Sequence, residues 1–157
     1  MPGVLRKEEP LAYPYSIYLG SYRILDSAQK AVSQYEKRGL FTYWVKVHLG
    51  KKGVWFRIFT GWFSKKKQAE EYIKKMNVSN AVIKKTGYSA LIGIYSSKKE
   101  LDRGAVELLK FGLCPYTIER MNGTSQLYSG AFITRAGSER HHSELASMGI
   151  ESKVVER

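Results

Sequence analysis

The sequence is poor in cysteine, in acidic residues and in long apolar runs. Cys114 is the only cysteine among 157 residues, which excludes an internal disulfide and a cysteine-rich metal site. No apolar run approaches the roughly 20 residues of a membrane-spanning helix, so we expect no membrane contact by this segment. Residues 1–15 contain no apolar signal-peptide core. If the natural protein is exported or anchored, we expect the responsible segment to lie outside this chain.

The residue types that usually carry catalysis or bind metals do not occur in useful arrangements. His141 and His142 are neighbours, so on a helix they point in different directions. The pairs Glu8-Glu9 and Glu70-Glu71 are also adjacent rather than facing each other, and they offer no acid–base geometry. We therefore predict no catalytic activity, no metal site and no cofactor.

Acidic residues are scarce mainly in the first half of the chain. The whole chain has 26 Lys and Arg against 14 Asp and Glu, a formal net charge of +12. Residues 1–86 hold 17 basic and 6 acidic residues, whereas residues 87–157 hold 9 and 8. An anionic partner is therefore expected to meet the first half.

The chain contains an internal repeat. YSIYLGSY (15–22) and YSALIGIY (88–95) share their Tyr, Ser, Gly and Tyr positions, and GWF (61–63) corresponds to GAF (130–132). Self-similarity at a fixed spacing indicates two copies of one structural unit. We expect an N-terminal tail over 1–13, a first repeat over 14–86 and a second over 87–157.

Each repeat has the pattern strand, helix, strand, strand, helix, strand. Alternating apolar residues predict strands and an apolar stripe predicts each helix. The expected fold class is α+β, with two tandem βαββαβ (ferredoxin-like) repeats. Each repeat would have a four-stranded antiparallel sheet with both helices on one face, leaving the other face open. The expected strands cover about 16–22, 42–48, 55–60 and 81–85, then 90–95, 116–120, 126–129 and 152–155.

The open face of the first sheet is rich in rings and cations. Strand alternation places apolar side chains on the helix side, and we assign Ile17, Leu19, Tyr43, Val45, Val47, Phe56 and Ile58 to that side. A slip of one residue would invert a strand. The open face then carries Tyr18, Trp44, Lys46, Trp55, Arg57 and Phe59.

The second repeat lacks much of this surface. Its equivalent positions are Leu91 for Tyr18, Thr124 for Trp55, Gln126 for Arg57 and Tyr128 for Phe59. A secondary binding role is therefore assigned only to Leu91, Gln126 and Tyr128.

These strands and helices resemble the SPOR domain, the sporulation-related repeat of bacteria. The resemblance is carried by SIYLGSY, DSAQKAVSQYEKRG, TYWVKV, WFRIFTGWF and SKKKQAEEYIKKM in the first repeat. In the second it is carried by LIGIYSSKKELDRGAVELLKFGL and LYSGAF. It covers residues 15–157. It implies a non-catalytic module of the bacterial cell envelope or periplasm, within a larger exported or anchored protein.

The family resemblance implies a peptidoglycan ligand, in particular septal glycan strands stripped of their stem peptides. The ligand would lie on the open sheet face, with rings against sugar C–H faces and Lys46 and Arg57 against the lactyl carboxylates. Ser21 keeps the serine that the family favours after the strand glycine, whereas Ile94 does not. Family members often have Gln where Tyr18 and Leu91 stand. The expected glycan-binding set is Tyr18, Ser21, Trp44, Lys46, Trp55, Arg57 and Phe59.

Two alternatives remain open from the sequence. The RNA-recognition motif shares the strand order, and KGVWFRIF (52–59) resembles part of its third-strand octamer, so nucleic acid is a possible partner. The third alternative is a protein-interaction module whose open sheets pack on each other or on another protein. The sequence does not determine the oligomeric state.

Overall fold

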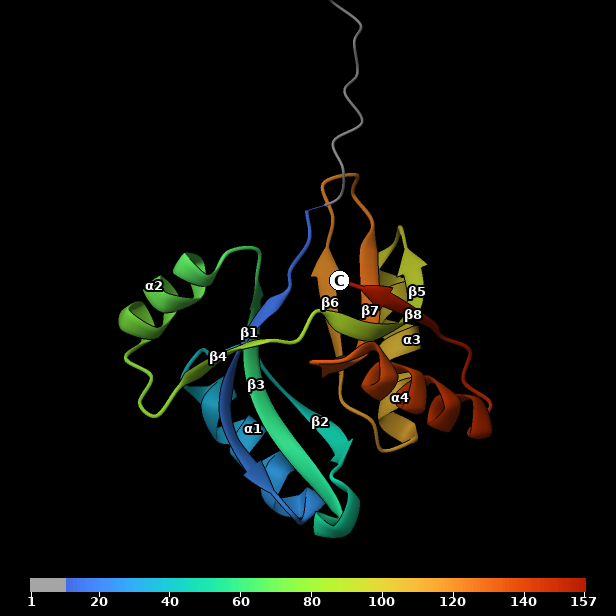
Figure 1. Ribbon diagram of the computed structural model, residues 1–157. Helices are drawn as coiled ribbons and strands as arrows, with labels where there is room; N and C mark the ends of the chain where they lie inside the picture. Colours follow the sequence, from blue (N-terminus) through green and yellow to red (C-terminus); the bar gives the residue numbers. More distant parts are fainter. Residues whose placement is uncertain (1–10) are drawn as a thin grey trace, which may run out of the picture.

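The computed structural model describes residues 11–157 as two βαββαβ repeats (Figure 1). The predicted tail over 1–13 lies outside the described residues except for Leu11, Ala12 and Tyr13. Repeat 1 consists of β1 (Tyr15–Tyr22), α1 (Leu25–Lys37), β2 (Thr42–His48), a short 3-10 turn (Gly50–Lys52), β3 (Val54–Phe63), α2 (Lys66–Met76) and β4 (Val82–Lys85). Repeat 2 consists of β5 (Tyr88–Tyr95), α3 (Lys98–Lys110), β6 (Pro115–Glu119), β7 (Ser125–Phe132), α4 (Arg135–Ser147) and β8 (Lys153–Glu156).

Both sheets are four-stranded and antiparallel, which confirms the predicted fold class. The strand order is β2-β3-β1-β4 in repeat 1 and β6-β7-β5-β8 in repeat 2. In each repeat both helices pack against the strands of their own sheet. Within residues 11–157, no helix combines the length and the apolar character needed to cross a bilayer.

The shared Gly-x-Phe sequence makes the same turn at the end of β3 and of β7. Gly61 and Gly130 have positive φ values of 69° and 84°, a conformation that glycine adopts without steric cost. A Cβ atom at Gly61 would lie 2.7 Å from the ring of Phe63, which packs against Tyr72 of α2. The glycine therefore lets the phenylalanine fold back under the helix that follows.

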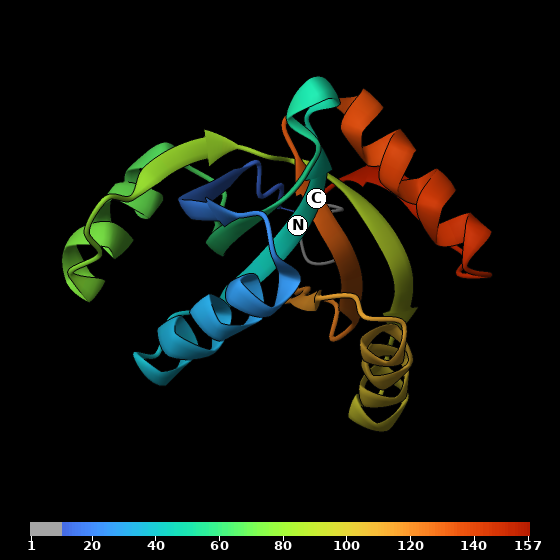
Figure 2. The same cartoon turned by 90° about the horizontal axis from the view of Figure 1, so that it is seen from below.

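The two sheets face each other in the middle of the molecule, with the helices outside them (Figure 2). One cluster of buried side chains joins their inner faces. Its members are Tyr43, Val45 and Phe59 of repeat 1 and Tyr116, Ile118, Tyr128, Ala131 and Phe132 of repeat 2. The predicted open faces therefore cover each other in part, as the protein-interaction alternative supposed.

Equivalent positions of the two repeats meet in this cluster, as they do in an isologous interface. Tyr43 and Tyr116 occupy the same place in their repeats, and their rings stack with centroids 4.3 Å apart. Phe59 and Tyr128 are also equivalent, and each stacks on the tyrosine of its own sheet. Burial of several aromatic rings against one another makes this layer a shared core.

The prediction for the faces of β2 is wrong by one residue. Tyr43 is paired with Phe59, and Trp44 with Ile58, so each pair lies on one face of the sheet. Trp44 packs under α1 in a cluster with Ile58, and Tyr43 lies between the sheets. The alternation misled because Thr42–Val45 is buried on both faces, so apolar residues on β2 do not distinguish the helix side from the sheet side.

Arg157 ties the two repeats together at the edge of the shared core. Its side chain is 1% exposed. The guanidinium donates hydrogen bonds of 3.0 Å to the hydroxyls of Tyr43, Tyr116 and Thr86, and one of 3.0 Å to the Tyr13 carbonyl. A buried cation is tolerated when its donors are satisfied, and here the acceptors come from both repeats.

Candidate functional site

The open face of the repeat 1 sheet is arranged in rows across β2, β3 and β1. The first row, Tyr43–Phe59–Tyr18, is buried at Tyr43 and Phe59, which are 0% and 1% exposed. In the second row, Val45 is buried, whereas Arg57 and Ser21 are half-buried. Repeat 2 therefore covers one end of this face and leaves the other accessible.

The accessible part carries two rings, a hydroxyl and a cation, and we call Tyr18, Ser21, Trp55 and Arg57 the uncovered strip. Ser21 and Arg57 are directly opposite each other on β1 and β3. The Tyr18 hydroxyl is 2.5 Å from the Ser21 hydroxyl. All four side chains are half-buried, so each one is supported by its neighbours and still reaches solvent.

Two further cations stack on the rings of the uncovered strip. The Arg23 guanidinium lies 5.3 Å from the centre of the Trp55 ring, and the Lys84 ammonium lies 5.9 Å from the centre of the Tyr18 ring. The Trp55 indole donates a hydrogen bond of 2.9 Å to the Lys52 carbonyl, which fixes the ring plane. The strip thus presents oriented rings within a positive field.

Two of the predicted ligand-binding residues are placed where a ligand does not reach. Trp44 is 7% exposed under α1, and its ring lies edge-on to Phe56 at 5.4 Å. Phe59 has the predicted face, but the second sheet covers it. The other predicted residues of repeat 1 retain exposed surface: Tyr18, Ser21, Lys46, Trp55 and Arg57.

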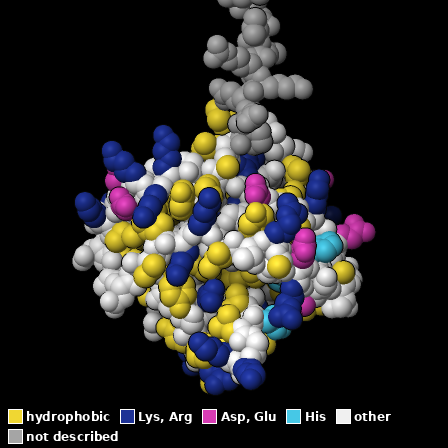
Figure 3. All heavy atoms as spheres, viewed as in Figure 1, with side chains coloured by type: hydrophobic (Ala, Val, Ile, Leu, Met, Phe, Trp, Pro, Cys, Tyr) yellow, Lys and Arg dark blue, Asp and Glu magenta, His cyan; other side chains and the backbone are white. Residues whose placement is uncertain are grey.

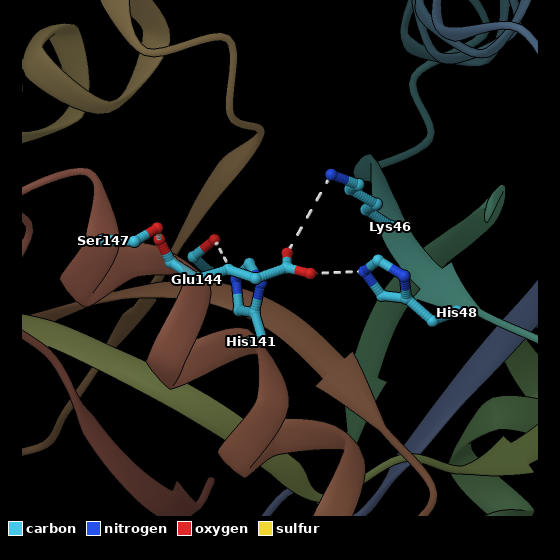
Figure 4. Close-up of polar contacts among 6 residues, drawn as sticks. Lys46, His48, His141, Glu144 and Ser147 are labelled. Atoms are coloured by element: carbon cyan, nitrogen blue, oxygen red, sulfur yellow. Dashed lines mark hydrogen bonds and ion pairs between the residues drawn. The ribbon is translucent and has the colours of Figure 1, made fainter.

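Lys46 is on the opposite face of β2 from the one predicted, because it is paired with Phe56. It still reaches repeat 2, since β2 is an edge strand beside α4. Its ammonium is 4.0 Å from a carboxylate oxygen of Glu144, and the other oxygen contacts the His48 ring (Figure 4). A polar contact between the repeats therefore borders the shared core.

His141 lies one turn before Glu144 on α4 and is buried beside this contact (Figure 4). Its Nε2 is 2.8 Å from the Ser129 hydroxyl, whereas Nδ1 has no hydrogen-bond partner among the described residues. Burial lowers the pKa of His141 to about 4, because a charged imidazolium loses its hydration there. The ring is therefore neutral near pH 7.

A groove of about 610 Å³ runs between the repeats, beside the uncovered strip. Repeat 1 contributes Val47 and Arg57 to one wall. Repeat 2 contributes Arg140 and residues 131–134, 136 and 137, where β7 ends and α4 begins. Among the residues that line it, Glu144 is the only acid.

The surface around the groove and strip is basic. Lys and Arg side chains are spread over repeat 1 and over the tip of the β2–β3 hairpin, with hydrophobic side chains exposed among them (Figure 3). This agrees with the excess of 17 basic over 6 acidic residues in 1–86. Such a surface attracts anions that also offer apolar faces.

The open sheet face of repeat 2 is covered both by repeat 1 and by the segment that precedes β1. Arg120 donates hydrogen bonds to Gln126 at 2.5 Å and to the Tyr128 hydroxyl at 3.0 Å. It also donates one of 2.6 Å to the Leu11 carbonyl, and its guanidinium lies over the Tyr13 ring. The predicted secondary site is thus filled: Tyr128 is 1% exposed and Leu91 packs against the shared core.

Sequence reasoning missed the contribution of repeat 2 to the groove. Arg140 and the start of α4 are more than 70 residues from Arg57 in the chain, and no local pattern connects them. In the sequence, Arg140 is only one of nine basic residues in 87–157, where the charges nearly balance. Nothing in that composition distinguishes it from the other eight. Among the described residues no group of three or more His, Cys, Asp or Glu side chains could hold a metal ion.

The fold and this surface define a class: a tandem βαββαβ module with a basic, aromatic sheet face. Residues 12–85 match the model of the SPOR domain, so repeat 1 belongs to the SPOR family. This family binds peptidoglycan in cell division, and its domains occur in bacterial envelope proteins. It is a binding family rather than a catalytic one. Searches of curated proteins and of solved structures found no match to the chain.

Proposed function

We propose that this chain binds peptidoglycan glycan strands that have lost their stem peptides, and that the uncovered strip of repeat 1 is the site. Stripped glycan is abundant where septal wall is being remodelled, so the chain would act at division sites in the cell envelope. The observation that carries the proposal is the accessible arrangement of Tyr18, Trp55 and Arg57 within a SPOR domain.

The chemistry of the strip suits this ligand. The C–H faces of a sugar ring pack on aromatic rings, and the Trp55 ring is held in place by Lys52 and Arg23. A strand without stem peptides exposes a lactyl carboxylate on every second sugar. The half-buried Arg57 can bind such a carboxylate through two parallel hydrogen bonds.

The burial of Phe59 weighs against RNA as the ligand. An RNA-recognition motif stacks bases on the aromatic residues of its central strands. In this chain Phe59, the last aromatic of the octamer-like segment 52–59, is 1% exposed between the sheets. A base could not stack on it unless the repeats separated.

The direct test measures retention of the purified chain on peptidoglycan sacculi before and after treatment with an amidase that removes the stem peptides. We expect stronger retention on the treated sacculi, persisting at moderate salt. Competing RNA should have no effect. Equal and negligible retention on both preparations would refute the proposal, and RNA binding with a steep salt dependence would favour the alternative.

Two substitutions locate the site. Trp55→Ala should abolish retention on treated sacculi and Arg57→Ala should weaken it at least tenfold, while both change the free energy of unfolding little, because both side chains keep solvent exposure. Tyr22→Ala is the matched control, since Tyr22 is an exposed aromatic paired with Phe56 on the other face of the sheet. If the control loses retention as fully as Trp55→Ala, the strip is not the site.

A further inference from the structure

We propose that the groove between the repeats is a carboxylate-binding subsite, in which Arg57 of repeat 1 and Arg140 of repeat 2 hold one anionic glycan from opposite walls. This deepens the proposed function and rests on it, because the carboxylates are those of the stripped strand. It also assigns repeat 2, whose own sheet face is filled, a part in binding.

The two arginines are available for a ligand. Within residues 11–157 neither Arg57 nor Arg140 forms an ion pair or a side-chain hydrogen bond. The one acid in the groove lining, Glu144, is already in contact with Lys46 and His48. Unneutralised cations that line one concave surface strengthen the positive field inside it.

The start of α4 adds to this field. Thr134 caps the helix by accepting a hydrogen bond of 3.1 Å from the Gly137 amide, and both residues line the groove. The first turn of this 13-residue helix contains no acidic residue. Its positive end is therefore not neutralised by the chain itself, and a bound carboxylate would be stabilised there.

A buried polar atom in the groove wall also lacks a partner. His141 lines the groove, is 7% exposed, and its Nδ1 has no hydrogen-bond partner among the described residues. Buried polar groups are normally paired, so this wall of the groove keeps one unused hydrogen-bonding atom just beneath its surface. A small shift of the wall on binding would let a sugar hydroxyl next to the carboxylate supply the missing bond.

The experiment compares amidase-treated sacculi with the same sacculi after chemical reduction of their carboxylates to alcohols. Arg140→Gln should weaken binding of the full chain to the carboxylate form by about tenfold, the loss expected for one charge-assisted pair. Its binding to the reduced form should equal that of the wild type. Arg57→Gln should show the same selective loss. Arg103→Gln, an exposed arginine on α3, is the control and should bind both forms like the wild type.

Two outcomes would overturn the subsite while leaving the proposed function intact. One is that Arg140→Gln behaves like Arg103→Gln on both preparations. The other is that it weakens binding to both forms equally, because the arginine would then not read the carboxylate. A wild-type chain that is not retained on treated sacculi would instead refute the proposed function. Arg140 is exposed, so the variant should unfold in urea at the wild-type midpoint.

Discussion

Phe59→Ala tests whether the two sheets share a core in solution. On a free binding surface, truncating a phenylalanine costs little stability, usually within about 0.5 kcal/mol. In this structure Phe59 is 1% exposed and packs against the ring of Tyr43 and the side chains of repeat 2. The same substitution therefore has two different expected costs, depending on whether the repeats are packed together.

The cost expected from the structure follows from burial. Removing a fully buried phenylalanine side chain loses its transfer free energy and leaves a cavity, together about 3–5 kcal/mol. Partial closure of the sheets over the cavity would place the value at the lower end of that range. For a chain of this size, a loss of about 3 kcal/mol corresponds to a decrease in Tm of roughly 10 °C.

The assay is equilibrium unfolding in urea, followed by tryptophan fluorescence and by circular dichroism. The wild type should unfold in one transition, because repeats that share a core unfold together. Phe59→Ala should lower the midpoint at an unchanged slope. Trp55→Ala is the control and should change the midpoint little. A cost below 1 kcal/mol for Phe59→Ala would refute the packing of the sheets and return Phe59 to the candidate ligand surface.

Three further predictions concern titration and backbone geometry. Below pH 6.5 the unfolded chain binds a proton at His141, whereas the folded chain excludes this proton down to about pH 4. The free energy of unfolding should therefore fall by about 1.4 kcal/mol for each unit by which the pH is lowered in that window. Urea titrations at several pH values measure this slope, which His141→Gln should reduce. Burial raises the pKa of Tyr43 to about 12, so between pH 10 and 12 the unfolded chain loses a proton that the folded chain keeps. This difference should lower stability by roughly 3 kcal/mol. A clearly smaller decrease in Tyr43→Phe than in the wild type over this range would confirm the source, because the raised pKa values of Cys114 and Tyr128 still contribute in the variant. Gly130→Ala should cost more than Gly123→Ala, since both have positive φ but only the Cβ at Gly130 would collide with the Phe132 ring. Gly123→Ala should cost about 1–2 kcal/mol of stability. Equal decreases in Tm for the two variants would contradict this reasoning.

The fold of each repeat could be predicted from local signals in the sequence. Alternating apolar residues located β1 and β2, and the recurrence of the Tyr-Ser…Gly…Tyr and Gly-x-Phe sequences identified the second copy. These signals are local, because the period of a strand and the φ requirement of a glycine depend on a few neighbouring residues. The prediction of β3 was right for the same reason: Phe56 and Ile58 face the helices, and Trp55, Arg57 and Phe59 do not.

Which of these side chains a ligand can reach depends on how the elements pack in three dimensions. Tyr43, Trp44 and Val45 are all buried, on opposite faces of β2, because a helix covers one face and a second sheet covers the other. Alternation separates faces only when one of them is polar, and here both are apolar. The stacking of Tyr43 on Tyr116, and the presence of Arg57 and Arg140 in the lining of one groove, depend on how the two repeats dock, which no local pattern encodes. The sequence thus predicts a basic, aromatic sheet face, and the docking of the repeats leaves a narrow strip of it accessible.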